Sequence, residues 1–182
     1  WENTAIAHGL LFKQTGSSAI SLQYKMPPVN LAHIKKLTTD FGMIQFSKIN
    51  QPDITSGYTL DDNARAMIAM CQHFEFSHDE EDIKYIRIYL RFIQHCLQPN
   101  GDFLNYVNEQ KDFSEQNNTT NLADSNGRAV WALGYLISMH NILPEELINA
   151  ADTVIQSALH NISYIHSTRA MAFAIKGLYY YN

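Results

Sequence analysis

The segment that decides the fold reads Gly57-Tyr58-Thr59-Leu60-Asp61-Asp62-Asn63-Ala64-Arg65-Ala66, and it returns in altered form as Asp124-Ser125-Asn126-Gly127-Arg128-Ala129. Both copies have the order Asp, three residues, Arg, Ala, and both run directly into an apolar helical stretch. A weaker third copy, His166-Ser167-Thr168-Arg169-Ala170, keeps Arg-Ala and lacks the Asp. The repeat predicts several helices that begin at one surface, each with polar residues at its start.

Apolar side chains at steps of three and four residues predict a chain made almost entirely of helices. Before the first motif we expect helices over 1–14 and 31–38, the second with Asn30 as its N-cap. From the first motif onward we expect helices over 60–75, 80–97, 124–141, 145–160 and 163–181. Residues 40–57 are predicted to be irregular with short extended pieces, and 102–107, within the polar loop 99–122, to form a short hairpin.

The helices that follow the three Arg-Ala motifs are rich in small residues on several faces. They alternate with acidic or ordinary amphipathic helices. Small residues on several faces are typical of helices crowded on all sides, as in the inner ring of a barrel of helices. The sequence therefore predicts an all-α fold made of helical hairpins.

Composition argues against several kinds of protein. The net charge of −5 disfavours a nucleic-acid binder, which usually has a basic face. No apolar run approaches the roughly 20 residues that span a bilayer. No signal peptide is visible, so we expect a cytoplasmic location. The start at Trp1, without an initiator Met, indicates a piece of a longer protein.

Residue spacing predicts no metal site and no cofactor. Cys71 and Cys96 lie in apolar helical patterns, where a buried free thiol is the usual outcome. The eight histidines show no HxxxH or HxH pairing, and no glycine-rich phosphate loop is present.

The carboxylates of the motif allow two interpretations. Asp61, Asp62 and Asp124 lie at helix starts, where free N–H groups and a partial positive charge favour carboxylates. In the first interpretation they are structural: they cap the helices, and Asp61 and Asp124 form ion pairs with Arg65 and Arg128, each four residues further along the same helix. In the second interpretation they are catalytic groups. As catalytic groups from separate helices, one would act as general acid and another as general base on a glycosidic bond.

A sugar site would need further polar and aromatic groups beside these carboxylates. The candidate substrate-binding residues are Tyr58, Asn63, Arg65, Tyr106, Asn126 and Arg128. Trp131 is a candidate aromatic platform, although its place inside a helix favours core packing.

These residues resemble an (α/α) toroid domain that occurs, alone or fused, in bacterial proteins classed as group 1 glycosyltransferases of the GT-B fold. The resemblance rests on Gly57–Ala66, Asp102-Phe103-Leu104-Asn105-Tyr106 and Asp124–Gly134, and it covers about residues 30–181. The helix from Trp1 to Lys13 resembles the closing helix of a GT-B transferase domain. By resemblance, 1–14 close a transferase domain, 15–29 form a linker, and 30–182 form a six-hairpin-glycosidase-like toroid, incomplete because it has too few helices.

Three functions remain open from the sequence. The domain binds or trims a glycan with acid/base carboxylates, binds a glycan without catalysis, or is a helical scaffold for protein interaction. By itself the chain lacks the nucleotide-sugar half of a transferase and should not transfer sugar. An incomplete ring would expose apolar surface, so we expect a homodimer or a monomer that tends to associate. The expected ligand is a carbohydrate.

Overall fold

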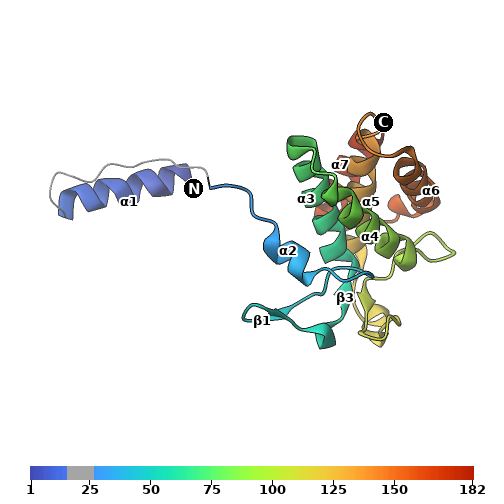
Figure 1. Cartoon of the computed structure of the whole chain (residues 1–182). Helices are drawn as coiled ribbons and strands as arrows, with labels where there is room; N and C mark the ends of the chain where they lie inside the picture. The colour runs from blue at the N-terminus through green and yellow to red at the C-terminus, as the bar shows by residue number, and fades with distance from the viewer. Residues whose placement is uncertain (16–26) are drawn as a thin grey trace. The chain divides into compact units, whose positions relative to one another are not determined.

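The computed structural model describes residues 1–15 and 27–182 (Figure 1). They fall into two compact units, Trp1–Asn30 and Leu31–Asn182. The first unit contains α1 (Glu2–Thr15), as predicted, and its large apolar side chains are exposed. The predicted linker over 15–29 lies largely outside the described residues.

The second unit is mostly helical, which confirms the all-α prediction at this coarse level. Its helices are α2 (Ala32–Leu37), α3 (Leu60–Ser77), α4 (Glu81–Cys96), α5 (Ala123–Ser138), α6 (Glu145–Ile162) and α7 (Thr168–Tyr181). Short extended and 3-10 pieces lie between them: β1 (Ser47–Lys48), β2 (Gln51–Pro52), η1 (Ile54–Ser56), β3 (Tyr58–Thr59), β4 (Tyr106–Val107) and η2 (Glu115–Asn118). The predicted irregular region with short extended pieces is thus confirmed.

Several predicted helix ends were wrong. The N-cap of α2 is Leu31, not Asn30. Helix α7 begins at Thr168, because the Ser167 hydroxyl accepts a hydrogen bond from the Ala170 N–H and caps the helix there. Helix α5 ends at Ser138, where the Met139 N–H bonds back to Leu136 in a tighter turn.

The predicted hairpin within residues 102–107 was also wrong. Strand β4 pairs antiparallel with the distant β3, in the register Tyr58↔Val107 and Thr59↔Tyr106. The approach is close at Gly57, which has φ +69°, and a Cβ built there would lie 2.3 Å from the Val107 carbonyl oxygen. The polar loop is therefore attached directly in front of α3.

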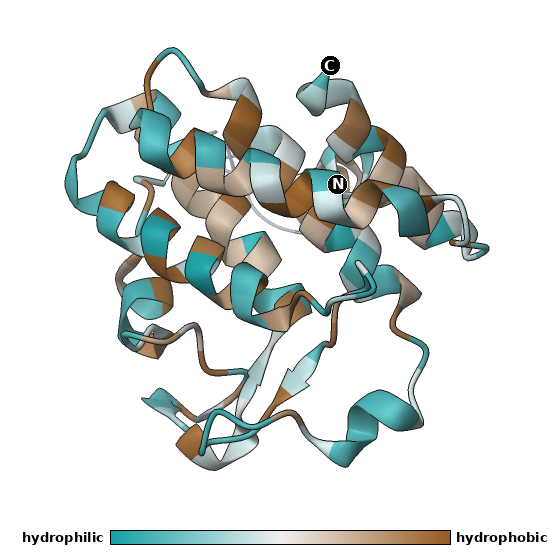
Figure 2. Cartoon of the chain, turned by 90° about the vertical axis from the view of Figure 1, so that its right-hand side faces the viewer, coloured by the Kyte–Doolittle hydropathy of each residue, from teal (hydrophilic) through white to brown (hydrophobic). Residues whose placement is uncertain are grey.

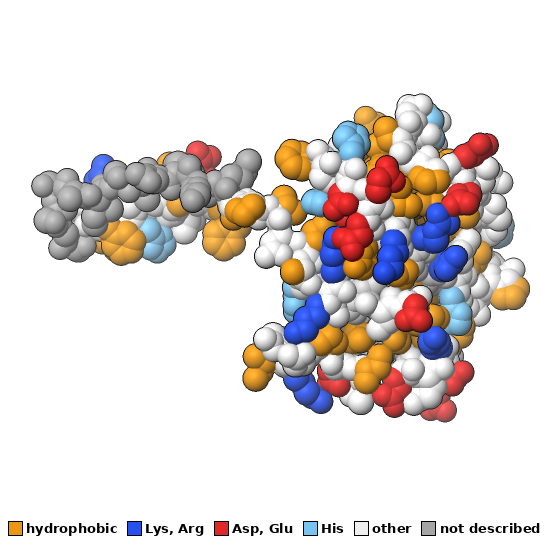
Figure 3. Space-filling view, in the orientation of Figure 1, with side chains coloured by type: hydrophobic (Ala, Val, Ile, Leu, Met, Phe, Trp, Pro, Cys, Tyr) orange, Lys and Arg blue, Asp and Glu red, His pale blue; other side chains and the backbone are white. Residues whose placement is uncertain are grey.

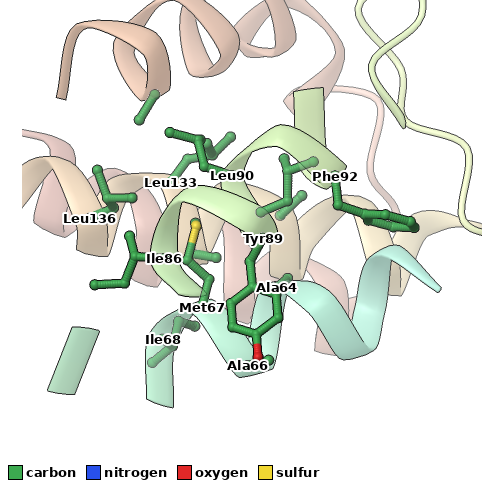
Figure 4. Packing of buried hydrophobic residues seen from close by; sticks show 14 of the residues in the cluster. Ala64, Ala66, Met67, Ile68, Ile86, Tyr89, Leu90, Phe92, Leu133 and Leu136 are labelled. Atoms are coloured by element: carbon green, nitrogen blue, oxygen red, sulfur yellow. The ribbon is translucent and has the colours of Figure 1, made fainter. Parts of the chain in front are cut away.

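Helix α5 has the most helix neighbours in the second unit. Helix α5 packs against both α3 and α7, while α4 packs against α3 and α6 against α5. Apolar and polar residues alternate along these helices (Figure 2). Side chains of α3, α4 and α5 meet in the core, among them Met67, Ile86 and Leu133, all fully buried (Figure 4). Helix α5 therefore lies between α3 and α7, the other two helices that follow an Arg-Ala motif.

Buried polar and thiol groups complete this core. Asp82 at the start of α4 is fully buried, and its carboxylate bonds to the ring of His73 on α3, which ties the two helices together. Cys71 and Cys96 are buried free thiols, as predicted, and burial raises the pKa of both. Among the described residues, no helix has the length and hydropathy that a bilayer crossing requires.

Helices α5 and α7 are in backbone contact. A Cβ built on Gly134 would lie 2.0 Å from the carbonyl oxygen of Gly177, and one built on Gly127 would lie 2.5 Å from that of Ala170. Real Cβ atoms are not found at such distances, so the contact requires glycine at these positions.

Gly134→Ala should therefore lower the free energy of unfolding by about 1–3 kcal/mol through overpacking, measured by urea denaturation. At an open helical position the same change would stabilise by about 1 kcal/mol, so the sign is diagnostic. Ala172→Gly, at an exposed position of α7, is the control and should cost only its helix propensity. Unchanged or increased stability of Gly134→Ala would contradict the close contact.

Candidate functional site

The aspartates and arginines of the motif pair between neighbouring helices. Arg128 on α5 places Nε 2.8 Å from Oδ1 of Asp61 on α3, and Arg169 on α7 places a guanidinium nitrogen 2.6 Å from Oδ2 of Asp124 on α5. The predicted pair of Asp124 with Arg128 is therefore wrong. We call the four residues Asp61, Arg128, Asp124 and Arg169 the Asp–Arg ladder.

The ladder follows from how tightly the helices pack. Because Gly127 lies against Ala170, the start of α7 comes close enough for Arg169 to reach Asp124. Arg128 Nε and Asp61 Oδ1 have no hydrogen-bond partner elsewhere in the described part of the chain, so each is neutralised by the other.

The first and third copies of the motif mark the ends of this ladder. Arg65 pairs within its own helix, at 2.5 Å from Asp62 and 3.4 Å from Asp61, so the predicted Asp61–Arg65 contact is present as the longer of the two. In the third copy, Ile165 stands four residues before Arg169, where the other copies have Asp. The third copy of the motif therefore contributes an arginine to the ladder but no carboxylate.

Asn63 and Asn126 occupy matching places in the first two copies and hold loops in the same way. Asn63 accepts from the Met43 N–H and donates to the carbonyls of Met43 and Thr59. Asn126 accepts from the Phe103 N–H and donates to the carbonyls of Phe103 and Leu122. Each amide thus pairs with one backbone residue of a preceding loop and with the carbonyl four residues back.

This loop-holding role leaves little of either asparagine for a ligand. Asn63 is fully buried, and the amide oxygen and both N–H groups of Asn63 and of Asn126 are engaged. The sequence-based prediction that Asn63 and Asn126 contact a sugar has little support from these hydrogen bonds. The sequence carried one signal of this role: Asn63 and Asn126 occupy the same position in the two copies of the motif.

The aromatic candidates lie in different surroundings. Tyr58 is 3% exposed and packs edge-on against Phe41, with ring centroids 5.1 Å apart. Tyr106 is half-buried on β4, where it pairs with Thr59, two residues before Asp61. Of the two, only Tyr106 offers side-chain surface beside the start of α3.

Trp131 packs within the helix layer, as its position in a helix predicts. Its ring stacks on Phe173 at 5.7 Å and 2°, and Lys176 Nζ lies 3.9 Å from its centroid. The Arg128 guanidinium carbon lies 4.2 Å from the Phe173 ring. Both rings are therefore already in contact with cations, which fixes Arg128 from a second side.

Asp61 has the most unusual electrostatic environment of the three carboxylates. Burial raises its pKa above the ordinary value, Arg128 and Arg65 oppose the rise, and the nearby charges of Asp62 and Asp124 add to it. Asp62 instead accepts a hydrogen bond of 2.6 Å from Thr59, whose hydroxyl oxygen in turn accepts from the Asp62 N–H. Asp62 is thus part of the cap of α3, as the capping interpretation expects.

Other kinds of site have less support among the described residues. No group of three or more His, Cys, Asp or Glu side chains is placed to hold a metal ion in residues 1–15 and 27–182. The face of the second unit shown in Figure 3 carries basic and acidic side chains together. Ion pairs of the described residues include Lys35 with Glu81 and Arg87 with Glu146. Mixed charge of this kind differs from the single-sign patch that nucleic acid requires.

A scan against models of protein families and a search of curated proteins both found no match to this chain.

Arg128→Ala should reduce the free energy of unfolding at pH 7 by about 1–3 kcal/mol, because it leaves the half-buried Asp61 carboxylate without its main partner. Urea denaturation across pH measures this cost. The cost should shrink as the pH falls through the raised pKa of Asp61, because the neutral carboxyl needs no cation.

The sign follows from the raised pKa of Asp61. The contribution of Asp61 to the free energy of unfolding is fully present below the pKa of the unfolded state and is lost as the pH rises through the pKa of the folded state. Removal of Arg128 raises the folded-state pKa further and so makes this loss larger. Arg91→Ala, at an exposed position of α4, is the control. A cost for Arg128→Ala that equals the control, or that does not change with pH, would contradict the pairing.

Proposed function

We propose that the second unit is a carbohydrate-binding domain whose ligand contacts the starts of α3 and α5. The observation that carries this proposal is the Asp–Arg ladder, which pairs charged groups of neighbouring helices while leaving part of each side chain exposed. The exposed fraction is 33% for Asp61, 17% for Arg128, 26% for Asp124 and 72% for Arg169. Fixed carboxylates and guanidinium groups match the alternating donors and acceptors of sugar hydroxyls. Because the ladder is formed before binding, a ligand would not have to order it.

The finer architecture is part of the same proposal. We infer that α3, α5 and α7 belong to the inner ring of an (α/α) toroid and that α4 and α6 belong to its outer ring. The packing of α5 between α3 and α7 supports this arrangement, as does the resemblance to the toroid of bacterial group 1 glycosyltransferases. A glycan made by such a transferase is the substrate class we propose.

Acid/base catalysis is the second candidate, and Asp61 favours it. A carboxyl with a raised pKa is suited to donate a proton to a leaving glycosidic oxygen. Against this role, Arg128 and Arg65 both contact Asp61 and favour its charged form. Binding is therefore proposed ahead of turnover.

Thermal unfolding and ligand-observed NMR with a panel of mono- and oligosaccharides test the proposal. The expected result is binding of at least one sugar by the wild-type chain and loss of at least tenfold in affinity in Asp124→Asn. Asp40→Asn, an exposed aspartate outside the ladder, should bind like the wild type.

The outcomes separate the candidate functions. No binding by any sugar, together with strong destabilisation by Asp124→Asn, would leave the ladder a purely structural device and contradict the proposal. Release of sugar from a bound oligosaccharide, abolished in Asp61→Asn, would establish turnover.

Self-association stays a prediction. The described face of α7 exposes Met171, Ile175 and Tyr179 at steps of four residues. Light scattering on the full chain would decide between a homodimer and a monomer.

A further inference from the structure

A cavity of about 610 Å³ has none of the four Asp–Arg ladder residues in its lining. It is bounded by the loop 98–104, the start of α5, the end of α6 and residues 164–165. Its volume is within the range of small-molecule sites. Much of its wall is apolar, from side chains such as Phe103, Val130 and Ile162.

The loop that forms one wall is held rigidly. The Asn161 amide donates to the Asn100 carbonyl at 2.7 Å and to Asp102 Oδ1 at 2.9 Å. The Asn100 amide donates to Asp102 Oδ2 at 3.0 Å. At Gly101, with φ +88°, a Cβ would lie 2.5 Å from the Ser157 carbonyl oxygen, so this contact with α6 depends on glycine. The Asp102 carboxylate is therefore fixed in position.

Asp102 is exposed to solvent, and no cationic side chain of the described chain pairs with its carboxylate. None of the described residues that line the cavity is Lys, Arg or His. The two oxygens of Asp102 accept only from neutral amides, and a carboxylate has further lone pairs to offer. The cavity thus disfavours anions and favours a positive charge.

The hydrogen-bond donors of the cavity are largely used up. Both N–H groups of Asn161 and of Asn126 are engaged by oxygens of the protein itself. The side-chain amides of Asn100 and Gln98 each donate one N–H, to the Asp102 carboxylate and to the Cys96 carbonyl respectively. What is left to a ligand is mainly acceptors, so the matching ligand is rich in donors.

We propose that this cavity, here called the Asp102 cavity, binds a small organic cation: a primary ammonium group that contacts the Asp102 carboxylate, on an apolar stem that packs against the apolar wall. Tyr164, which lines the cavity and is 65% exposed, adds an aromatic face suited to a cation. The ammonium group comes either from a free amine or from a lysine side chain of another protein.

NMR titration of the full chain with n-pentylamine and with 1-pentanol tests the proposal, because the two probes share a stem and differ in charge. Pentylamine should shift the amide signals of residues 98–104 and bind at least about tenfold more tightly than pentanol, as a charge-assisted hydrogen bond implies. In Asp102→Asn this preference should disappear. Asp112→Asn, which removes the same charge from an exposed residue of the neighbouring loop, should retain it.

Equal binding of the two probes by the wild-type chain, no binding of either, or an unchanged preference in Asp102→Asn would overturn the proposal. The wild-type comparison stands even if a variant folds poorly.

A third probe, N-acetyl-lysine-N-methylamide, identifies the source of the ammonium group. Tighter binding than pentylamine supports a protein lysine, and weaker binding supports a free amine. These experiments use no sugar and no ladder residue, so their outcome is independent of the carbohydrate proposal.

Discussion

The backbone contact between α5 and α7 is the constraint on which the rest of the motif geometry depends. Glycines at 127, 134 and 177 let the two helices approach to a distance that any side chain would prevent. That approach places Arg169 beside Asp124 and Phe173 beside Arg128. Arg128, held by Phe173 on one side, meets Asp61 of α3 on the other. Three helices are thus connected by contacts that start from one close packing surface.

The repeated motif therefore has a structural meaning at each position. In the first two copies the aspartate pairs with an arginine of the next motif helix, and the asparagine holds the backbone of a preceding loop. In the second and third copies the arginine pairs with an aspartate of the previous motif helix, whereas Arg65 of the first copy pairs within its own helix. These roles account for the order Asp, Asn, Arg without requiring a ligand. A ligand site is compatible with them because the ladder groups stay partly exposed. For the same reason the ladder supports binding more directly than catalysis.

The sequence predicted the helices well and their connections poorly. Periodic apolar residues placed α3, α4 and α6 within a few residues, because burial of one helical face is a local property. The pairing of Tyr106 with Thr59 was missed, since strands of two residues carry too little pattern to reveal a distant partner. The partner of Arg128 was assigned to its own helix for a similar reason. Spacing along a chain identifies neighbours four residues away, whereas the distance between α3 and α5 is set by packing.

The candidate site shows the same limit. Sequence reasoning selected the ladder aspartates but gave Asn63 and Asn126 to a ligand, although their amides are taken by loop backbone. It did not find the Asp102 cavity, because Asp102 and Asn161 lie far apart in the chain and meet only through the contact at Gly101. The sequence placed Asp102 only in the expected hairpin over 102–107 and in a segment that resembles the toroid domain.

The central claim is that the ladder joins neighbouring helices, and a pair of double-mutant cycles sharing Arg128 tests it most directly. Free energies of unfolding would be measured for the three single variants Asp61→Asn, Asp124→Asn and Arg128→Ala. They would also be measured for the two double variants that combine Arg128→Ala with Asp61→Asn or with Asp124→Asn. The structure predicts a coupling of about 1–3 kcal/mol between Asp61 and Arg128 and a coupling near zero between Asp124 and Arg128. Coupling of Arg128 to Asp124 instead of Asp61 would contradict the account, because the ion pairs would then lie within the helices.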